Sequence, residues 1–156
     1  MAVVISVVLM LKQMSSADIQ VLGQMGNGHD YVDLQRHPDA RAIPGVLIVR
    51  PSEALFFANV ERILGGALHL ARHAEPPVHT IILSLEESPD LDGTSIEALE
   101  AFFLQVRALD MLLILARLKH EAKAVLARLP TQEMEQVILS GLSVDGAVQQ
   151  ALKPST

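Results

Sequence analysis

Three short apolar runs, each followed by a stretch with helical spacing, constrain the fold of this chain more than any other feature. They are GVLIVR at 45–50, VHTIILSL at 78–85 and MLLILARL at 111–118. Continuous apolar runs of this length are typical of strands that are covered on both faces. The alternation of such strands with helices of ten or more residues predicts an α/β fold, with parallel strands joined by right-handed crossovers.

The helices expected between these strands show apolar residues at i, i+3, i+4 and i+7. The first spans 59–74 and contains Gly65 and Gly66. Each glycine costs roughly 1 kcal/mol relative to alanine, so we expect this helix to need packing support and to be a candidate for mobility. The remaining expected elements are a first strand at 17–25, a long loop at 26–45, a helix with its stripe at 96–106, a helix at 122–129, a short edge strand at 136–140 and a helix at 143–152 capped by Ser143.

The composition limits the classes of function. A chain of 156 residues holds one substantial core and is too short for two ordinary domains. The net charge of -6 and an aromatic content of 3% disfavour nucleic-acid binding, because the chain repels phosphates and offers few rings for stacking. Cysteine is absent, which excludes disulfides, thiolate metal sites and cysteine nucleophiles.

The apolar run at residues 1–11 is shorter than the roughly 20 residues that span a bilayer. It also lacks the basic region and the cleavage pattern of a secretory signal. Two interpretations remain: a buried segment of a soluble fold, or the end of a longer membrane helix with Lys12 at the interface. The pattern alone slightly favours the first.

The stretch LDGTSIEALEAFF at 91–103 is predicted to begin a helix and carries two adjacent hydroxyls, Thr94 and Ser95. With Thr94 as the N-cap, Glu97 occupies the third helical position, which is the arrangement of a capping box. The same hydroxyl follows a central strand, where a phosphate would meet the positive end of the helix dipole. The two roles are compatible, and the structural one is sufficient to explain the pattern.

Other candidate sites are weaker. His69 and His73 lie four apart on a predicted helix, but no third metal ligand accompanies them. The glycines near residue 26 match no phosphate-binding loop. The carboxylates at 86–92 lack a base with an orienting partner, and no nucleophile motif occurs. We therefore predict no catalytic residue, no metal and no cofactor.

Three stretches resemble the STAS domain (sulfate transporter and anti-sigma factor antagonist), and specifically the C-terminal cytosolic domain of SulP-type anion transporters. They are YVDLQRHPDARAIPGVLIVRPSEALFFANVERI at 31–63, VHTIILSLEESPDLDGTSIEAL at 78–99 and VVISVVLMLKQMSS at 3–16. The last is similar to the end of a final membrane helix and its exit to the domain. The resemblance implies a sheet whose first strand pair is antiparallel and whose remainder is mostly parallel, with about four to five helices. It also implies two parts, a remnant of a membrane helix or an apolar leader at 1–14 and the STAS domain at 15–156.

The resemblance also suggests roles for individual residues. Asp92 matches the family's turn aspartate, Gly93 replaces a usual small hydroxyl residue, and Thr94 falls where anti-sigma antagonists carry a phosphorylated serine. Ser95 stands where glycine is common. The candidate residues are therefore the phosphoacceptors Thr94 and Ser95, the partner-facing turn of Asp90, Asp92 and Gly93, and an interaction face at Phe57 and Asn59.

These residues lead to one functional prediction and two alternatives. We expect a non-catalytic regulatory or interaction domain at the cytoplasmic face of the membrane, with the transporter's own membrane domain and an unidentified cytosolic protein as partners. Weak nucleotide binding and a homodimer formed through the parent transporter are further expectations. The first alternative is a free-standing anti-sigma factor antagonist, switched by phosphorylation of Thr94. The second is a small α/β enzyme or a nucleotide-binding module.

Overall fold

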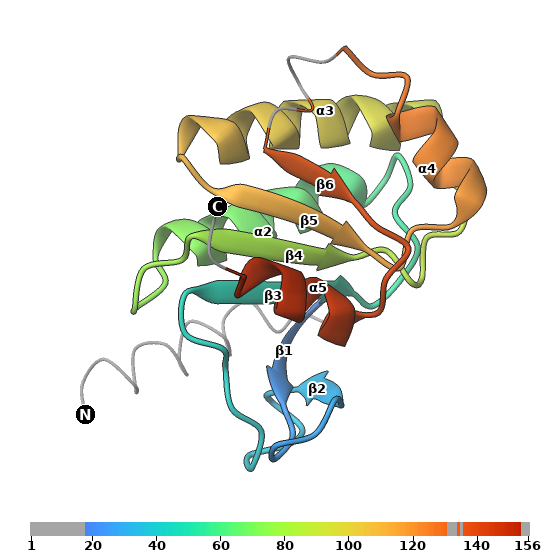
Figure 1. Ribbon diagram of the computed structural model, residues 1–156. Coiled ribbons are helices and arrows are strands. Elements are labelled where there is room, and N and C mark those ends of the chain that lie inside the picture. Colours follow the sequence, from blue (N-terminus) through green and yellow to red (C-terminus); the bar gives the residue numbers. More distant parts are fainter. Residues whose placement is uncertain (1–17, 131–133, 135, 154–156) are drawn as a thin grey trace.

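The computed structural model describes residues 18–130, 134 and 136–153. In this part of the chain a six-stranded sheet has the order β2-β1-β3-β4-β5-β6 (Figure 1). The strands are β1 (Ile19–Gln24), β2 (Tyr31–Asp33), β3 (Val46–Pro51), β4 (Thr80–Ser84), β5 (Leu112–Ala116) and β6 (Val137–Leu139). The helices are α2 (Val60–Arg72), α3 (Gly93–Ala108), α4 (His120–Leu126) and α5 (Val144–Ala151).

Strand β1 runs antiparallel to both of its neighbours, and every pair from β3 to β6 is parallel. The predicted α/β class, with an antiparallel beginning and a parallel remainder, is confirmed. Helices α2, α3 and α4 connect the parallel strands, and the order of the strands shows that each connection moves one position along the sheet.

Strand β2 was not predicted, because the whole of 26–45 was expected to be a loop. Its three residues pair with the end of β1, where Gly23 lies opposite Val32. A Cβ atom on Gly23 would lie 2.3 Å from the Leu34 side chain and 2.8 Å from the carbonyl oxygen of Arg41, so this close approach requires glycine. A three-residue strand is too short to show a periodic pattern, which is why the sequence did not reveal it.

The central strands β3, β4 and β5 bury both of their faces, as the continuous apolar runs predict. Alternate residues contribute to two cores, since successive side chains of a strand point to opposite faces. One core packs the sheet against α2, α3 and α4 and includes Leu47, Val49, Ile81, Leu83, Leu113 and Leu115. The other packs the sheet against α5 and includes Val46, Ile48, Ile82, Ile114, Ala116 and Val148.

Helix α2 receives the support that its two glycines require. Its buried residues include Leu64, Ala67 and Leu68, which belong to the same core as Phe102 and Phe103 of α3. A Cβ atom on Gly65 would meet no heavy atom within 4 Å, so packing does not demand glycine there. The mobility of α2 stays a prediction.

The expectations for residues 1–14, including a remnant of a membrane helix, lie outside the described residues. Within 18–130, 134 and 136–153, no helix is both long and apolar enough to cross a membrane.

Candidate functional site

The turn between β4 and α3 begins at the carboxyl end of the sheet and leads into the first turn of α3. Helix α3 starts at Gly93, and Asp92 is its N-cap, with Oδ1 accepting a hydrogen bond of 2.8 Å from the backbone N–H of Ser95. The predicted capping box, with Thr94 as the N-cap, is therefore wrong. An aspartate caps a helix as well as a hydroxyl residue does, and here it lies two residues earlier.

The same carboxylate holds a second segment of the chain. Asp92 Oδ2 accepts a hydrogen bond of 2.9 Å from the backbone N–H of Phe57, 35 residues away. The hydroxyl and the N–H of Ser95, with a smaller contribution from the Phe57 N–H, lower the pKa of Asp92. One side chain thus joins the two segments that the sequence analysis singled out separately.

The two candidate phosphoacceptors differ in exposure. Thr94 lies in the first turn of α3 and is exposed, whereas Ser95 is 0% exposed. The Ser95 hydroxyl lies beside the Asp92 carboxylate, but it makes no hydrogen bond of ordinary geometry in the described part of the chain. A kinase acting on the folded domain can therefore reach Thr94 and not Ser95.

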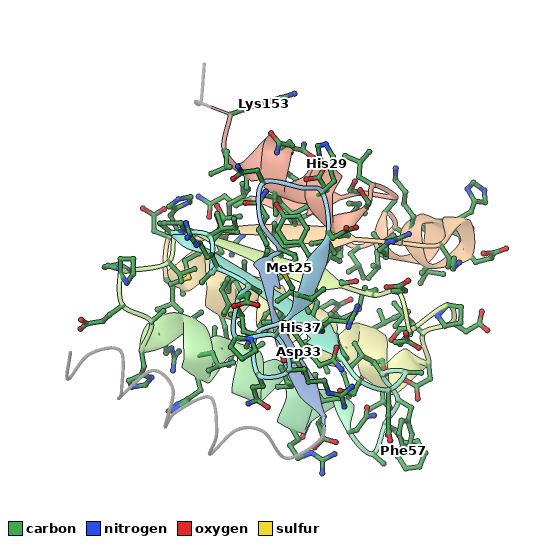
Figure 2. The ribbon with its side chains drawn as sticks, turned by 90° about the horizontal axis from the view of Figure 1, so that it is seen from below. Met25, His29, Asp33, His37, Phe57 and Lys153 are labelled. Carbon is green, nitrogen blue, oxygen red and sulfur yellow. The ribbon has the colours of Figure 1, made fainter. Side chains whose placement is uncertain are left out.

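The loop before α2 presents aromatic rings to solvent. Phe57 is 70% exposed and Phe56 is 41% exposed, and their rings pack edge to face with centroids 5.6 Å apart. Figure 2 shows Phe57 at the margin of the molecule, away from His29, which lies between β1 and β2. The two adjacent exposed rings form a contiguous apolar patch, which makes them a candidate contact.

Asn59, which was expected to share this interaction face, is only 4% exposed. Its Oδ1 accepts from the N–H of Phe56 at 2.9 Å, and its Nδ2 donates to the carbonyl of Ala54 at 3.0 Å. The prediction that Asn59 faces a partner was wrong, because its side chain satisfies the backbone of the loop. Its role is to shape the loop that presents Phe57.

A further hydrogen bond ties this loop to the turn. The buried hydroxyl of Ser88 accepts from the N–H of Leu55 at 2.9 Å. We call six of the exposed residues of these two joined segments the Phe57–Thr94 surface; they are Phe56, Phe57, Asp90, Asp92, Gly93 and Thr94. The surface combines an apolar projection with two carboxylates, an arrangement suited to contact with a partner.

The structure does not join the other candidates into a site. His69 on α2 and His73 at its C-cap are exposed, with ring centroids 4.3 Å apart, and His73 Nδ1 lies 2.9 Å from the carbonyl oxygen of His69. Among the residues that the structure describes, no group of three or more His, Cys, Asp or Glu could hold a metal ion. Glu86 and Glu87 are exposed on the turn.

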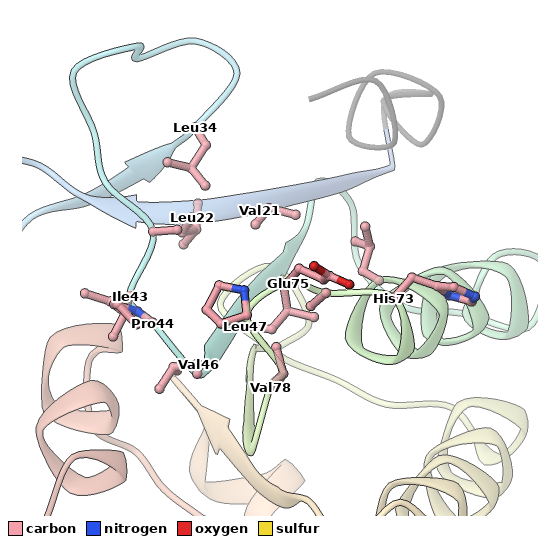
Figure 3. A pocket seen from close by; sticks show the side chains of 15 residues that line it. Val21, Leu22, Leu34, Ile43, Pro44, Val46, Leu47, His73, Glu75 and Val78 are labelled. Carbon is pink, nitrogen blue, oxygen red and sulfur yellow. The ribbon is translucent and has the colours of Figure 1, made fainter. Parts of the chain in front are cut away.

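Sequence reasoning missed the cavities that the described residues form, two of which lie beside the sheet. One, of about 180 Å³, lies at the amino end of β3, where residues such as Val21, Leu22, Ile43, Val46 and Val78 make it largely apolar (Figure 3). The other is polar, has a volume of about 360 Å³ and lies near the carboxyl ends of β3 and β5. Each draws its walls from segments far apart in the sequence, so no local pattern indicates either one.

Comparison with known proteins extends over most of the chain. The model of the STAS domain matches residues 37–143. High affinity sulfate transporter 1 of Stylosanthes hamata is 30% identical over 145 residues, which cover 88% of this chain and 21% of that protein. Sulfate transporter 1.1 of Arabidopsis thaliana is 29% identical over 123 residues, covering 74% of this chain and 19% of that protein. The chain therefore spans about one fifth of the length of these curated relatives.

Two solved structures share the fold. The murine Solute Carrier 26 family member A9 anion transporter, in its inward-facing state, aligns with a TM-score of 0.74 and 18% identity over 96% of this chain and 25% of that chain. A Thermotoga maritima protein described as an anti-sigma factor antagonist aligns with a TM-score of 0.58 and 14% identity over 72% of this chain and 92% of that chain. At such identities the likeness establishes the fold alone.

Proposed function

Since the chain belongs to the STAS domain family, we propose that it is the non-catalytic docking domain of a SulP-type anion transporter. The curated relatives that support this proposal are sulfate transporters, and the chain corresponds to about one fifth of each. In this proposal the transported anion, whether sulfate, bicarbonate or a dicarboxylate, binds in the membrane portion. The domain itself lies at the cytoplasmic face of the membrane and contacts the membrane domain or a cytosolic protein.

The observation that carries the proposal is the double hydrogen bonding of Asp92. Its carboxylate fixes the exposed turn at the start of α3 and the loop that presents Phe57 in one arrangement. An exposed aromatic side chain held on a fixed backbone loses little conformational entropy when it enters a partner's pocket. The neighbouring carboxylates of Asp90 and Asp92 favour a partner whose pocket has a basic rim.

The test uses the full transporter that contains this domain. We expect Phe57→Ala and Thr94→Glu each to weaken the association of the domain with its partner, the first by removing the apolar contact and the second by adding charge. Thr94→Ala separates loss of the hydroxyl from gain of charge. Leu152→Ala is a matched control, because Leu152 is 52% exposed at the end of α5 and lies outside the Phe57–Thr94 surface.

Transport, assembly and partner binding are the three measurements for this set of variants. Reduced values for Phe57→Ala and Thr94→Glu, together with unchanged values for Leu152→Ala, support docking through this surface. If all four variants behave like the parent protein, the turn and the loop are only structural.

The second candidate function is a phosphorylation switch of the anti-sigma antagonist type. It is favoured by the exposure of Thr94 in the first turn of α3, and a shared fold with the Thermotoga maritima protein is consistent with it. Incubation with candidate kinases followed by intact-mass analysis tests this function, with Thr94→Val as the control. Absence of added phosphate, or the same addition to Thr94→Val, counts against it.

Two finer parts of the proposal have their own measurements. Weak binding of a nucleotide is tested by calorimetry with purine nucleotides, where no saturable heat argues against it. A homodimer formed through the parent transporter is tested by comparing the mass of the isolated domain with that of the transporter in detergent. A monomeric domain within a dimeric transporter supports it.

A further inference from the structure

The polar cavity of about 360 Å³ lies on the face of the sheet that α5 covers, near the carboxyl ends of the parallel strands. Arg50 comes from the end of β3, and Arg117 directly follows β5. The remaining walls include the hairpin between β1 and β2 and the start of α5, which approach each other near His29 (Figure 2). The carboxyl ends of parallel strands are a common place for ligands in α/β folds.

Two guanidinium groups line this cavity without a carboxylate partner. Arg50 donates from Nε and Nη2 to Oε1 of Gln20, its registered neighbour on β1, and this partner is neutral. Arg117 takes part in none of the ion pairs found within the described ranges. Two guanidinium groups that line one cavity and form no ion pair within the described ranges can bind the oxygens of an anionic ligand.

Three carboxylates also line the cavity, and they differ in exposure and in their partners. Asp145 Oδ2 pairs with His29 Nδ1 at 2.9 Å. Asp30 and Glu86 also line the cavity, and both are exposed, as Arg117 is, so water and salt screen all three charges. The half-buried ionisable groups of the cavity are Arg50, Tyr31 and Asp145.

Two buried polar atoms in the same cavity lack partners. The Tyr31 hydroxyl and Oδ1 of Asp145 are both buried, and neither makes a hydrogen bond in the part of the chain that the structure describes. Burial, and then the charge of Asp145, raise the pKa of Tyr31, so this hydroxyl keeps its proton and can donate. Buried polar groups are nearly always paired, and a ligand that accepts from Tyr31 and donates to Asp145 would satisfy both atoms.

We propose that this cavity binds a small organic oxyanion that carries a hydroxyl group next to its anionic group. Arg50 and Arg117 hold the anionic oxygens, and the Tyr31 hydroxyl donates to them. Asp145 Oδ1 accepts a hydrogen bond from the ligand's hydroxyl. This site is separate from the Phe57–Thr94 surface and does not rest on the docking proposal.

Isothermal titration calorimetry on the 156-residue chain tests the site. The probes are glycerol 3-phosphate, inorganic phosphate and sulfate, each measured against sodium chloride at equal ionic strength. We expect saturable binding of glycerol 3-phosphate and weaker binding of inorganic phosphate and sulfate, because these two offer no hydroxyl group on a carbon chain to Asp145. No saturable heat from glycerol 3-phosphate overturns the site.

Variants assign the roles of individual side chains. Arg117→Gln is expected to weaken binding of glycerol 3-phosphate at least about ten-fold, the usual effect of losing a charge-assisted hydrogen bond. Arg72→Gln is the matched control, since it makes the same charge change on an exposed residue of α2 outside the cavity. Equal affinities of the two variants overturn the role of Arg117. Thermal unfolding shows whether Arg117→Gln is folded, and Arg50→Gln provides an independent second variant.

The proposed contact between the ligand's hydroxyl group and Asp145 has a separate test. Asp145→Ala is expected to reduce the preference for glycerol 3-phosphate over inorganic phosphate, because only the first ligand uses the Asp145 acceptor and alanine removes it. If wild type binds both phosphates with equal affinity, the assignment of Asp145 is wrong and the class of ligand is overturned.

Discussion

Replacement of Asn59 by alanine tests whether the loop that presents Phe57 is shaped by one buried side chain. The variant loses two hydrogen bonds, from the N–H of Phe56 to Oδ1 and from Nδ2 to the carbonyl of Ala54. Each contributes about 0.5–1.5 kcal/mol net, so the free energy of unfolding is expected to fall by about 2 kcal/mol. For a chain of this length, that corresponds to a Tm lower by about 4–8 °C.

Phe57→Ala is the companion variant, two residues away on the same loop. Its ring is 70% exposed, so its loss is expected to change the free energy of unfolding by no more than about 0.5 kcal/mol. Scanning calorimetry and urea unfolding, followed by circular dichroism, measure both variants. The docking measurement is expected to show the reverse order, with Phe57→Ala impaired although it is fully stable.

The result that refutes this reasoning is equally specific. If Asn59→Ala unfolds at the same temperature as the parent chain, its two hydrogen bonds do not hold the loop. If Phe57→Ala is the less stable variant, Phe57 is a packing residue and the Phe57–Thr94 surface loses its apolar contact.

Four further predictions concern backbone strain and titration. Gly65→Ala is expected to raise the free energy of unfolding by about 1 kcal/mol, since a Cβ there meets nothing within 4 Å inside a helix; an unchanged or lower urea midpoint contradicts this. Gly45→Ala is expected to lower the free energy of unfolding by about 2 kcal/mol or more, since Gly45 has φ +77° and a Cβ atom there would lie 2.6 Å from the His79 ring. A thermal midpoint equal to that of the parent chain refutes the clash. Tyr31 is the only tyrosine and tryptophan is absent, so ultraviolet absorbance is expected to show one phenol that ionises above its ordinary pKa of 10.0. Because the folded-state pKa is raised, the free energy of unfolding is expected to fall as the pH rises through that raised value. Titration at the ordinary value counts against burial of the hydroxyl. Because the pKa of Asp92 is lowered in the folded state, its carboxylate contributes stability that is present above the ordinary pKa of 3.8 and is lost as the pH falls through the folded-state pKa. If the free energy of unfolding of Asp92→Asn falls with acid in the same way as that of the parent chain, another group is responsible.

The parts of the fold that the sequence predicts are those with a long, repeated signal. The three apolar runs became β3, β4 and β5, and the serine before the last helix became its cap, with Ser143 Oγ accepting from the N–H of Gly146 at 3.2 Å. These patterns depend on neighbours within a few positions, so they can be interpreted without knowledge of the fold. Strand β2 depends on pairing with β1, and three residues do not reveal a partner.

The same difference between local patterns and long-range contacts applies to the candidate site. Thr94 was the predicted cap of α3, whereas Asp92 is its cap in the structure. The contact of Asp92 with Phe57, 35 residues away, belongs to an arrangement that local sequence does not contain. Asn59 looks like a surface residue, and only the course of the loop makes it buried. The polar cavity combines the hairpin with Arg50, Arg117 and Asp145, which are brought together by the order of the strands.

The unequal cover of the two faces of the sheet has a consequence for biosynthesis. Within the described residues, α2, α3 and α4 lie between successive strands in the sequence, whereas α5 follows β6. During translation, one side of the nascent sheet can thus be closed progressively. The apolar side chains of the other face, including Ile48, Ile82 and Ile114, are not covered by α5 until that helix has left the ribosome. Apolar surface that is exposed during this interval is open to chaperones and to aggregation.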